Sequence, residues 1–476
     1  MHDTYSTDTI PQIESLLAAQ RTTFLRHGAP SLLQRRDDLK KLRTAILSRR
    51  REIEQAIDAD FGHRSFHETS MMELLSVAEN IGYMRRNLRR FMRPQRRHAS
   101  FTFGPGRARI VYQPLGVVGV MAPWNYPVVL AIAPLVTALA AGNRVMIKPS
   151  EITPRTSECL KRLLAATFPK EQVAVVLGDA TVGAAFSALP FDHLVFTGST
   201  RVGSAVMRAA SDNLVPVTLE LGGKSPVIIE KGHVNDRTLG RIVFGKLSNA
   251  GQTCVAPDYV LVHEDDAEAF VAAFGPMVAK FFPQGPTSPD FSSIINERSY
   301  DRLKGLVDDA RAKGARVLEV GNRPETAANR AHTLAPTLIV GATDDMLVMQ
   351  EEIFGPILPV RAYRSIEDVV DFVNSRPRPL ALYYFGEEGE SCRKVLSHTT
   401  SGNVGINNTV LHVGQDALPF GGVGPSGMGN YHGIEGFRRL SHAKGVFAQG
   451  RLSIPDIVRA PFGRLADRVL AFMLRP

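Results

Sequence analysis

From residue 116 onward, short runs of β-branched and apolar residues alternate with longer segments of helical spacing. This alternation is typical of a parallel sheet whose strands are connected by helices that cover its two faces. It predicts an α/β fold with a doubly wound sheet. We expect strands at Val117–Met121, Arg144–Lys148, Val173–Leu177, His193–Phe196 and Val215–Glu220, and helices near Val128–Ala140, Thr153–Thr167 and Val202–Ala210.

A second alternating region begins after Ser225, whereas the first hundred residues have the spacing of helices. A chain of 476 residues is long enough for two packed domains. We predict N-terminal helices and a first α/β domain over residues 1–225, a second α/β domain over residues 226–418, and a C-terminal segment over residues 419–476 that returns to the first domain. The segments behind this interpretation are Leu32–Ile57, Glu68–Phe91, Phe244–Ala250, Leu338–Val340, Leu358–Val360 and Leu380–Phe385.

The cysteines and the apolar segments indicate a cellular compartment. Cys159, Cys254 and Cys392 are widely spaced, so they form neither a disulfide framework nor a metal-ligand pattern, and we expect no metal. Met1–Gln20 lacks the basic and apolar parts of a secretory signal. The most apolar stretch, Val128–Ala141, is shorter than a membrane span. We therefore expect a cytoplasmic protein.

Two basic segments raise the question of an anionic partner. The formal net charge is +9, and seven arginines lie within Arg85–Arg97, which would suit nucleic acid or a lipid surface. A solvated helix end explains the same cluster, and we favour it because no nucleic-acid-binding module accompanies it. The tail, Ile454–Pro476, would lie on a membrane surface or, as we expect, pack on the protein or on a dimer partner. Its helically spaced residues are Phe462, Leu465, Val469 and Phe472, among Arg459, Arg464, Arg468 and Arg475.

Gly198, Ser199 and Gly203 lie where an expected strand runs into an expected helix. Glycines there would let the backbone approach a pyrophosphate, and the free N–H groups of the helix start favour negative charge. An ordinary tight turn would explain the glycines as well. Gly422–Gly427 matches the spacing of a dinucleotide fingerprint, but it follows no expected strand and contains Pro425, so we reject it.

Lys148 and Glu151 follow the second expected strand. A lysine and a carboxylate at a strand end would hydrogen-bond the hydroxyls of a ribose, as acidic residues do in dinucleotide sites. A surface strand that simply ends at Pro149 is the alternative.

Cys254 stands among small residues that leave room for a substrate carbon beside its sulfur, namely Gly251, Thr253 and Ala256, before Pro257. An isolated free cysteine is usually a buried core residue. This neighbourhood instead favours a nucleophile whose thiolate attacks a carbonyl group. The backbone N–H of Cys254 would help to hold the resulting oxyanion.

Three further segments carry polar groups that suit the same chemistry. Asn125 offers an uncharged NH₂ donor for an oxyanion, although it also suits the cap of the helix that follows. Glu220 ends an expected strand before two glycines, and would either activate water or be a solvated strand end. Glu352 and Phe354 place a carboxylate near an aromatic ring, or form a simple turn.

Taken in order, these segments resemble the signature blocks of the aldehyde dehydrogenase superfamily, from about Asp60 to Lys444. The Val-Ala-Pro-Asp-Tyr run after Cys254 and the Ser-Gly-Met-Gly-Asn-Tyr-His-Gly run that ends at Gly433 resemble its class 3-like branch. The Asp-Phe-Gly-His-Arg-Ser run that begins at Asp60 is similar to bacterial coniferyl aldehyde dehydrogenases. The stretches outside Asp60 to Lys444 carry no family signature.

The resemblance implies an aldehyde dehydrogenase-like fold, with a Rossmann-type cofactor domain, a catalytic thiol domain and an oligomerisation element that makes a homodimer. It implies oxidation of an aldehyde to the carboxylic acid through a cysteine thiohemiacetal and a thioester, with NAD or NADP as cofactor. It implies that Cys254 is the nucleophile, Glu220 the general base and Asn125 the oxyanion donor. It also implies that the cofactor contacts Lys148 and Glu151 with its adenosine ribose, and Gly198, Ser199 and Gly203 with its pyrophosphate. Its nicotinamide ribose and ring would lie near Glu352 and Phe354.

Substrate and reaction class stay open at this stage. Trp124, Tyr126, Phe244 and Phe420 would line a pocket for an aromatic aldehyde such as coniferyl aldehyde, yet medium-chain aliphatic aldehydes fit apolar residues equally. An acylating dehydrogenase would pass the thioester to coenzyme A, but a carboxylate at Glu220 favours hydrolysis. A non-catalytic binding protein on the same scaffold is the remaining alternative.

Overall fold

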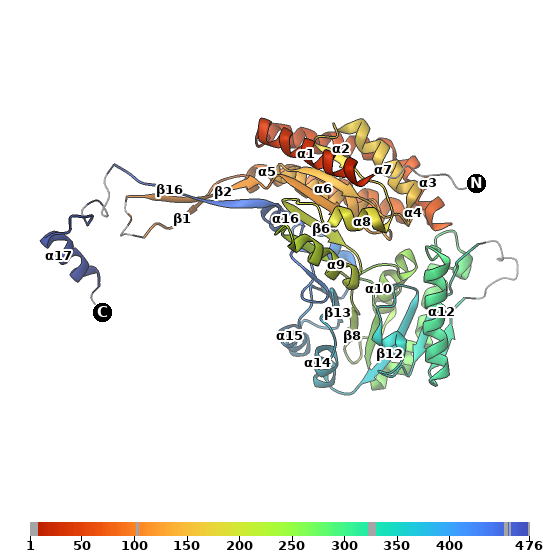
Figure 1. Ribbon diagram of the computed structural model, residues 1–476. Coiled ribbons are helices and arrows are strands. Elements are labelled where there is room, and N and C mark those ends of the chain that lie inside the picture. Colours follow the sequence, from red (N-terminus) through yellow and green to blue (C-terminus); the bar gives the residue numbers. More distant parts are fainter. Residues whose placement is uncertain are drawn as a thin grey trace.

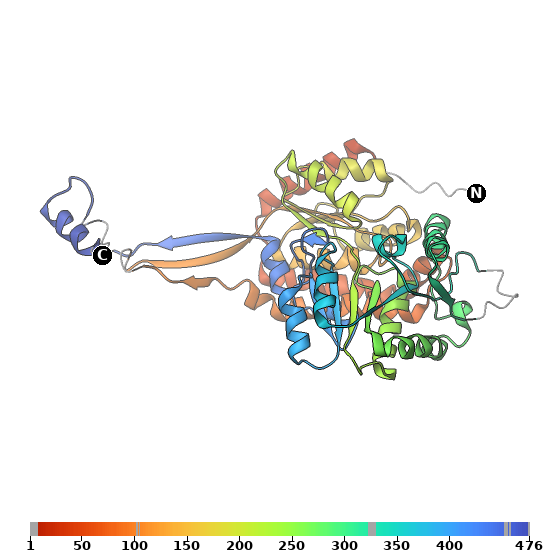
Figure 2. The ribbon, with the colours of Figure 1, turned by 90° about the horizontal axis from the view of Figure 1, so that it is seen from below.

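The computed structural model describes residues 8–100, 103, 105–321, 330–451, 456 and 458–474. Their strands form three sheets, of six, seven and three strands. The first two lie in two packed α/β halves, and the third extends from the body as a long arm (Figures 1 and 2). This architecture confirms the predicted α/β fold.

The N-terminal helices pack along the first half, as predicted (Figure 1). In α5, the apolar residues Val77, Ile81, Met84 and Leu88 recur at intervals of three and four, so one face of the helix is buried. The elements are α1 (Ile10–His27), α2 (Leu32–Ser48), α3 (Arg50–Phe61), α4 (Phe66–Thr69), the π-helical η1 (Ser70–Leu75) and α5 (Ser76–Phe91).

The six-stranded sheet has the order β15-β7-β6-β3-β4-β5, and its strands from β7 to β5 are parallel. Side chains of β3 enter separate hydrophobic clusters on the two faces, Val117 on one and Val118 with Val120 on the other, so the sheet is doubly wound. The expected strands and helices are confirmed, and α8 is additional. The elements are β3 (Val117–Met121), α6 (Val129–Ala141), β4 (Arg144–Lys148), α7 (Pro154–Thr167), β5 (Val173–Val175), α8 (Ala180–Ser187), β6 (His193–Thr197), α9 (Thr200–Ser211) and β7 (Val217–Glu220).

The seven-stranded sheet has the order β10-β11-β12-β9-β8-β13-β14, parallel except for β10 at its edge. The predicted second α/β region is confirmed, and β8 and β9 in the centre are additional. The strands are β8 (Pro226–Ile229), β9 (Tyr259–His263), β10 (Arg316–Glu319), β11 (Thr337–Val340), β12 (Ile357–Tyr363), β13 (Ala381–Phe385) and β14 (Asn403–Ile406).

Helices cover this second sheet and bury one large apolar cluster against it. One 3₁₀ turn, η3, directly precedes the loop that contains Cys254. The helical elements are α10 (Asp236–Leu247), η3 (Ser248–Gly251), η4 (Glu264–Asp266), α11 (Ala267–Phe281), η5 (Gly285–Thr287), α12 (Glu297–Ala312), α13 (Leu347–Gln350), α14 (Ile366–Asn374), α15 (Glu390–His398) and η7 (Leu411–Gly414).

The C-terminal part returns to the first half and then leaves it. Strand β15 (Gly427–Met428) pairs with β7, and α16 (Gly433–Arg439) leads into β16 (Ser441–Ala448). Strand β16 pairs along the whole of β2 (Arg107–Pro114), and β1 (Gln95–Arg97) pairs on the other side of β2, which makes the arm (Figure 2).

Beyond the arm lies α17 (Arg464–Met473), so the predicted helical tail is confirmed there. Its apolar side chains are exposed, with Leu465 at 57% and Phe472 at 70%. Ile454 and Arg475, which belong to the predicted tail, lie outside the described residues. Within the described part of the chain, no helix combines the length and apolar character needed to cross a membrane.

Candidate active site

A cavity of about 220 Å³ lies between the two halves of the molecule. It brings together eight of the residues predicted for the site, although they are spread over more than two hundred positions of the sequence. The lining residues are Pro123, Trp124, Asn125, Leu130, Thr197, Gly198, Ser199, Glu220, Leu221, Gly222, Cys254, Glu352 and Phe354.

The topology explains why these segments meet. Strands β7, β6 and β3 are parallel neighbours, so their carboxyl ends lie side by side at one edge of the sheet. Glu220 ends β7, Thr197 ends β6, and Pro123 follows β3 closely. In open α/β sheets this edge is where ligands bind. The second half contributes Cys254, which follows η3, and Glu352, which follows α13.

The chain before Cys254 has an unusual backbone. Asn249, Ala250 and Gly251 are consecutive residues with positive φ angles of 52°, 51° and 77°. Such conformations are costly for residues with a side chain, and they persist only where the surroundings hold them. At Gly251 a Cβ atom would lie 2.3 Å from the carbonyl oxygen of Gly355. This turn and the residues after it, 249–254, form the thiol loop, which carries the Cys254 thiol to the cavity.

The Cys254 thiol lies in a surrounding that disfavours its charged form. Part of the side chain reaches the cavity, but protein atoms enclose the sulfur, and this burial raises the pKa of Cys254 to about 12. The nearby carboxyl groups of Glu352 and Glu220 act in the same direction. The thiol is therefore neutral near pH 7 in the protein alone.

Glu220 is only 3% exposed, and neither carboxyl oxygen has a hydrogen-bond partner within the described residues. Burial without compensation raises its pKa well above the ordinary value. Its backbone is held by the pairing of β7 with β15, opposite Gly427. A carboxyl group without a hydrogen-bond partner among the described residues thus lies in the same cavity as a thiol.

Glu352 lies against the chain just after Glu220. Its carboxylate accepts a hydrogen bond from the Gly223 N–H, and a Cβ atom at Gly222 would lie 2.2 Å from its Oε2. Burial raises the pKa of Glu352 to about 8. Glycine at position 222 therefore leaves the space that this carboxylate occupies.

Asn125 is buried and joins the two halves. Its Nδ2 donates to the Gln252 carbonyl oxygen at 3.1 Å, close to Cys254 in the chain. Asn125 does not cap α6, because Oε2 of Glu73 accepts the N–H groups of Val128 and Val129 there, at 2.7 and 3.0 Å. The alternative of a helix cap for Asn125 is thus wrong, and its NH₂ group faces the thiol loop.

Several predicted residues lie outside this cavity. Lys148 Nζ pairs with Glu151 Oε2 at 2.9 Å at the end of β4, the next strand along the sheet. Gly203 packs inside α9, where a Cβ atom would lie 2.6 Å from the Leu221 side chain. Ser199, in contrast, does line the cavity, and it also caps α9 through a hydrogen bond that its Oγ accepts from the Val202 N–H at 3.4 Å.

The four aromatic residues predicted for a substrate pocket separate in space. Trp124 lines the cavity, and its ring meets that of Phe354 edge to face at 5.5 Å. Tyr126 is buried, and its Oη is 2.9 Å from Thr253 Oγ1. Phe420 stacks on the His432 ring at 5.1 Å. These last two side chains are not among those that line the cavity.

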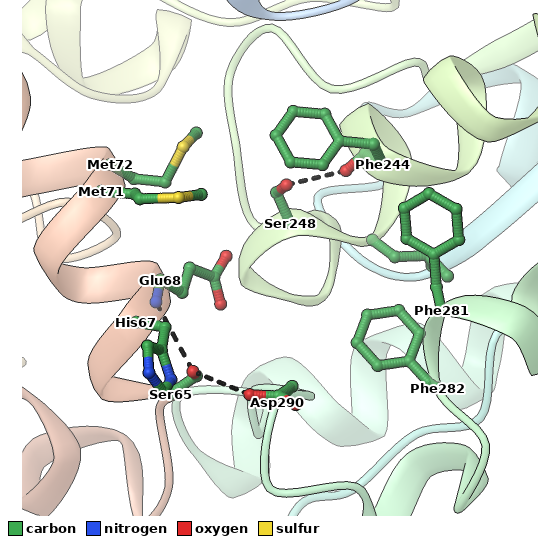
Figure 3. Close-up of a pocket in the computed structure, with 11 residues that line it drawn as sticks. Ser65, His67, Glu68, Met71, Met72, Phe244, Ser248, Phe281, Phe282 and Asp290 are labelled. Carbon is green, nitrogen blue, oxygen red and sulfur yellow. Dashed lines mark hydrogen bonds between the residues drawn. The ribbon is translucent and has the colours of Figure 1, made fainter. Parts of the chain in front are cut away.

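Phe244 lines a second cavity, of about 150 Å³, between the N-terminal helices and the second half. Met71 and Met72 lie on one side of it, and Phe281 and Phe282 on the other, as Figure 3 shows. Ser65, His67, Glu68, Leu247, Ser248 and Asp290 complete the lining. Ser248 begins the turn η3 that precedes Cys254, so this cavity touches the chain segment that leads into the thiol loop.

Sequence reasoning missed the polar residues that support the site. Arg64 and Glu73 form an ion pair in which both side chains are buried, and Asn249 and Gln252 are buried within the thiol loop. Arg64 lies within the Asp-Phe-Gly-His-Arg-Ser run that was noted for its resemblance, but charged residues in a helical segment are ordinarily exposed. No spacing pattern predicts which of them is buried.

Known proteins match this chain along most of its length. The model of the aldehyde dehydrogenase family matches residues 3–446. A probable coniferyl aldehyde dehydrogenase of Pseudomonas aeruginosa is 51% identical over 97% of this chain and 96% of that protein. A coniferyl aldehyde dehydrogenase of Pseudomonas sp. is 47% identical, again over 97% of this chain and 96% of that protein.

Solved structures agree with these matches. A substrate-bound Staphylococcus aureus AldH has a TM-score of 0.90 at 37% identity, over 97% of this chain and 99% of that one. A Mycobacterium tuberculosis aldehyde dehydrogenase complexed with NAD⁺ has a TM-score of 0.85 at 28% identity, over 94% of this chain and 92% of that one. With a thiol and a carboxyl group in one cavity of the shared fold, this chain belongs to the aldehyde dehydrogenase family.

Proposed function

We propose that this enzyme oxidises an aromatic aldehyde of the coniferyl aldehyde type to its carboxylic acid, with NAD as cofactor. The observation that carries the reaction is the shared cavity of Cys254, Glu220 and Asn125. The names of relatives at 47% and 51% identity support the substrate.

The residues present fit NAD. The cavity lies at the carboxyl ends of parallel strands and beside the start of α9, where free N–H groups suit a pyrophosphate. At the end of β4, the half-exposed carboxylate of Glu151 suits ribose hydroxyl groups. Glu352 and Phe354, near the thiol, would adjoin the nicotinamide end. When bound there, NAD accepts the hydride that the substrate loses.

In the first part of the proposed mechanism, the Cys254 thiol passes its proton to water, and the sulfur then bonds to the aldehyde carbon. The carbonyl oxygen becomes an oxyanion, which the Asn125 Nδ2 and the Cys254 backbone N–H stabilise. The carbon–oxygen double bond then re-forms as hydride leaves the carbon, and the product is a thioester on Cys254.

In the second part, water attacks the thioester carbon while Glu220 takes one of its protons. The carbon–sulfur bond breaks, the acid leaves and the Cys254 thiolate returns. A base must hold its proton weakly enough to release it, yet tightly enough to accept it near neutral pH. The raised pKa of Glu220 suits this role better than an ordinary exposed carboxylate would.

The second cavity supports the aromatic substrate class. Its walls combine thioether and aromatic side chains, with Met71 and Met72 opposite Phe244 and Phe281. Methionine sulfur and aromatic rings make favourable contacts with an aryl group. We propose that the ring of the aldehyde is held on this side while its carbonyl group reaches Cys254.

A panel of aldehydes tests this proposal. The ratio kcat/KM is measured for coniferyl aldehyde, benzaldehyde and straight-chain aldehydes, each with NAD and with NADP. We expect the highest value for coniferyl aldehyde with NAD. A preference for straight chains would overturn the substrate, and acid formation that requires coenzyme A would overturn hydrolysis.

We further propose that the enzyme is a cytoplasmic homodimer that involves its arm. The arm is only three strands wide and is largely exposed, so β1 and β16 are edges that another chain can cover. Light scattering at micromolar concentration tests the dimer, and a monomer would overturn it.

A further inference from the structure

Arg64 and Glu73 form an ion pair whose two side chains are 0% exposed, with Nη1 and Oε1 3.0 Å apart. Arg64 lies two residues before the start of α4, and Glu73 lies in the π-helical turn η1. Removing two charges from water is costly, and the attraction between them rarely returns more than it costs. The pair therefore calls for a reason other than stability.

The pair holds both ends of the segment that carries Asn125. At one end, Arg64 Nη1 donates to the Asn125 carbonyl oxygen at 3.0 Å. At the other end, Glu73 Oε2 accepts the N–H groups of Val128 and Val129 at the start of α6. The Arg64 guanidinium also lies over the Tyr126 ring, 4.7 Å from its centre.

The thiol loop holds the same segment from the opposite side. Asn249 Nδ2 donates to the Asn125 carbonyl oxygen at 2.9 Å, so this oxygen accepts from both halves. The Asn125 side chain donates one N–H to the Gln252 carbonyl oxygen at 3.1 Å. An amide NH₂ has two N–H groups. One therefore stays available for an oxyanion on a carbon bound to Cys254.

We propose that Arg64 and Glu73 are positioning residues, which act through Asn125 to fix its free N–H where the oxyanion forms. This rests on the oxyanion role proposed for Asn125. An oxyanion hole works because its donors are already in place before charge develops. The buried pair supplies that rigidity, since moving either partner would leave the other charged and unpaired.

The chain offers a matched control for a merely structural role. Asp60 also holds the start of a helix, because its carboxylate accepts the N–H groups of Arg155 and Thr156 at 3.0 and 2.8 Å. These belong to α7, and among the described residues Asp60 forms no hydrogen bond or ion pair with Asn125 or with the thiol loop. Asp60→Asn therefore weakens a comparable cap without reaching the site.

A double-mutant cycle on the full-length enzyme tests the proposal. The rate of the first turnover is measured from the burst of NADH at saturating coniferyl aldehyde, and NAD affinity by a separate fluorescence titration. Glu73→Gln should slow the burst by about tenfold or more, because small shifts of a catalytic donor are costly. NAD affinity should stay within about twofold. In an Asn125→Ala background, Glu73→Gln should slow the burst less than about twofold further, since the pair acts through Asn125.

The outcomes separate the two hypotheses. An unchanged burst in Glu73→Gln, or an equal slowing in the Asn125→Ala background, overturns the positioning role. The same holds if Asp60→Asn slows the burst as much as Glu73→Gln. An Asn125→Ala enzyme with an unchanged burst would instead overturn the oxyanion role itself. If Glu73→Gln does not fold, Arg64→Lys replaces it in the same double-mutant cycle with Asn125→Ala. This variant keeps the positive charge but loses the planar guanidinium group.

Discussion

Asn125 Nδ2 donates a hydrogen bond to the backbone oxygen of Gln252 at 3.1 Å, two residues before Cys254. The donor follows a strand of the first sheet, and the acceptor lies in the loop of the second half. Together with the bonds from Asn249 Nδ2 to the Asn125 oxygen and between Tyr126 Oη and Thr253 Oγ1, this bond joins the two halves at the point where the thiol lies. The chemistry of the site depends on this relative position.

The first prediction concerns Asn125. Asn125→Ala should lower kcat by about 10²–10³, the usual loss when one oxyanion donor is removed. The rate at which iodoacetamide alkylates Cys254 should change little, since alkylation forms no oxyanion. Steady-state kinetics and mass spectrometry measure the two rates. A kcat within a few-fold of the wild-type value would contradict the assignment.

The second prediction concerns Glu220. Glu220→Gln should still release a burst of NADH close to one per active site and then stall, because the amide cannot take a proton from water. Stopped-flow absorbance measures the burst, and intact mass spectrometry should show an acyl group retained on Cys254. Full steady-state turnover in this variant would exclude Glu220 as the base.

The third prediction concerns the pH dependence of the thiol. Ionised carboxylates near Cys254 disfavour the thiolate, so they raise its pKa, and removing one should lower it. The pKa of Glu352 is about 8, so it is charged in the range where Cys254 titrates. Glu352→Gln should therefore move the alkylation profile of Cys254 to lower pH.

Alkylation rates between pH 6 and about 11 in the absence of cofactor provide that measurement, because the thiolate is the reactive form. Burial remains in the variant, so its pKa should stay above that of a free cysteine, about 8.5. Glu351→Gln is the matched control, since this neighbouring carboxylate is exposed and does not act on Cys254. A shift to higher pH in Glu352→Gln would contradict the electrostatic account.

The fourth prediction concerns the backbone of the thiol loop. Gly251→Ala should lower the free energy of unfolding by about 2–4 kcal/mol, because it combines a positive φ with a Cβ atom pressed against the Gly355 oxygen. Chemical denaturation measures the loss. Gly314→Ala has the same sign of φ but open space around its Cβ atom, so it should cost less. If both variants lose the same free energy of unfolding, the positive φ alone accounts for the loss and the contact with the Gly355 oxygen does not contribute.

The fifth prediction concerns the aryl group of the substrate. Phe244→Ala should lower kcat/KM for coniferyl aldehyde by about tenfold, through lost apolar contact, and that for acetaldehyde much less. Phe447→Ala, on the exposed arm, is the control. An equal loss of kcat/KM for both aldehydes would show that Phe244 supports the thiol loop and does not bind the substrate.

Much of the fold could be predicted from local pattern. The central strands β3, β4 and β6 are continuous apolar runs bounded by glycine, proline or polar residues, as buried parallel strands are. Strand β15 was not predictable in this way. It has two residues, and only its pairing opposite Glu220 makes it a strand.

For the candidate site, too, the sequence predicted some features and the tertiary structure decided the others. Residue types and small neighbours marked Cys254 and Glu220 as candidates, and the resemblance to the family then implied their roles. Placement in space was decided by packing: Phe244 lines a cavity of its own, while Tyr126 and Phe420 line neither that one nor the cavity of the thiol. Side-chain type limits what a residue can do, but a shared location depends on contacts between distant segments.

The buried pair of Arg64 and Glu73 shows this most clearly. In the sequence they are two ordinary charges in a helical region, of the kind that usually lies in water. The tertiary structure buries both, with Arg64 bonded to the backbone oxygen of Asn125 and Glu73 bonded to the N–H groups of Val128 and Val129. The sequence by itself determined the α/β architecture and marked the candidate reactive groups. Only the tertiary structure decided their geometry, since burial and direction arise when separate segments pack together.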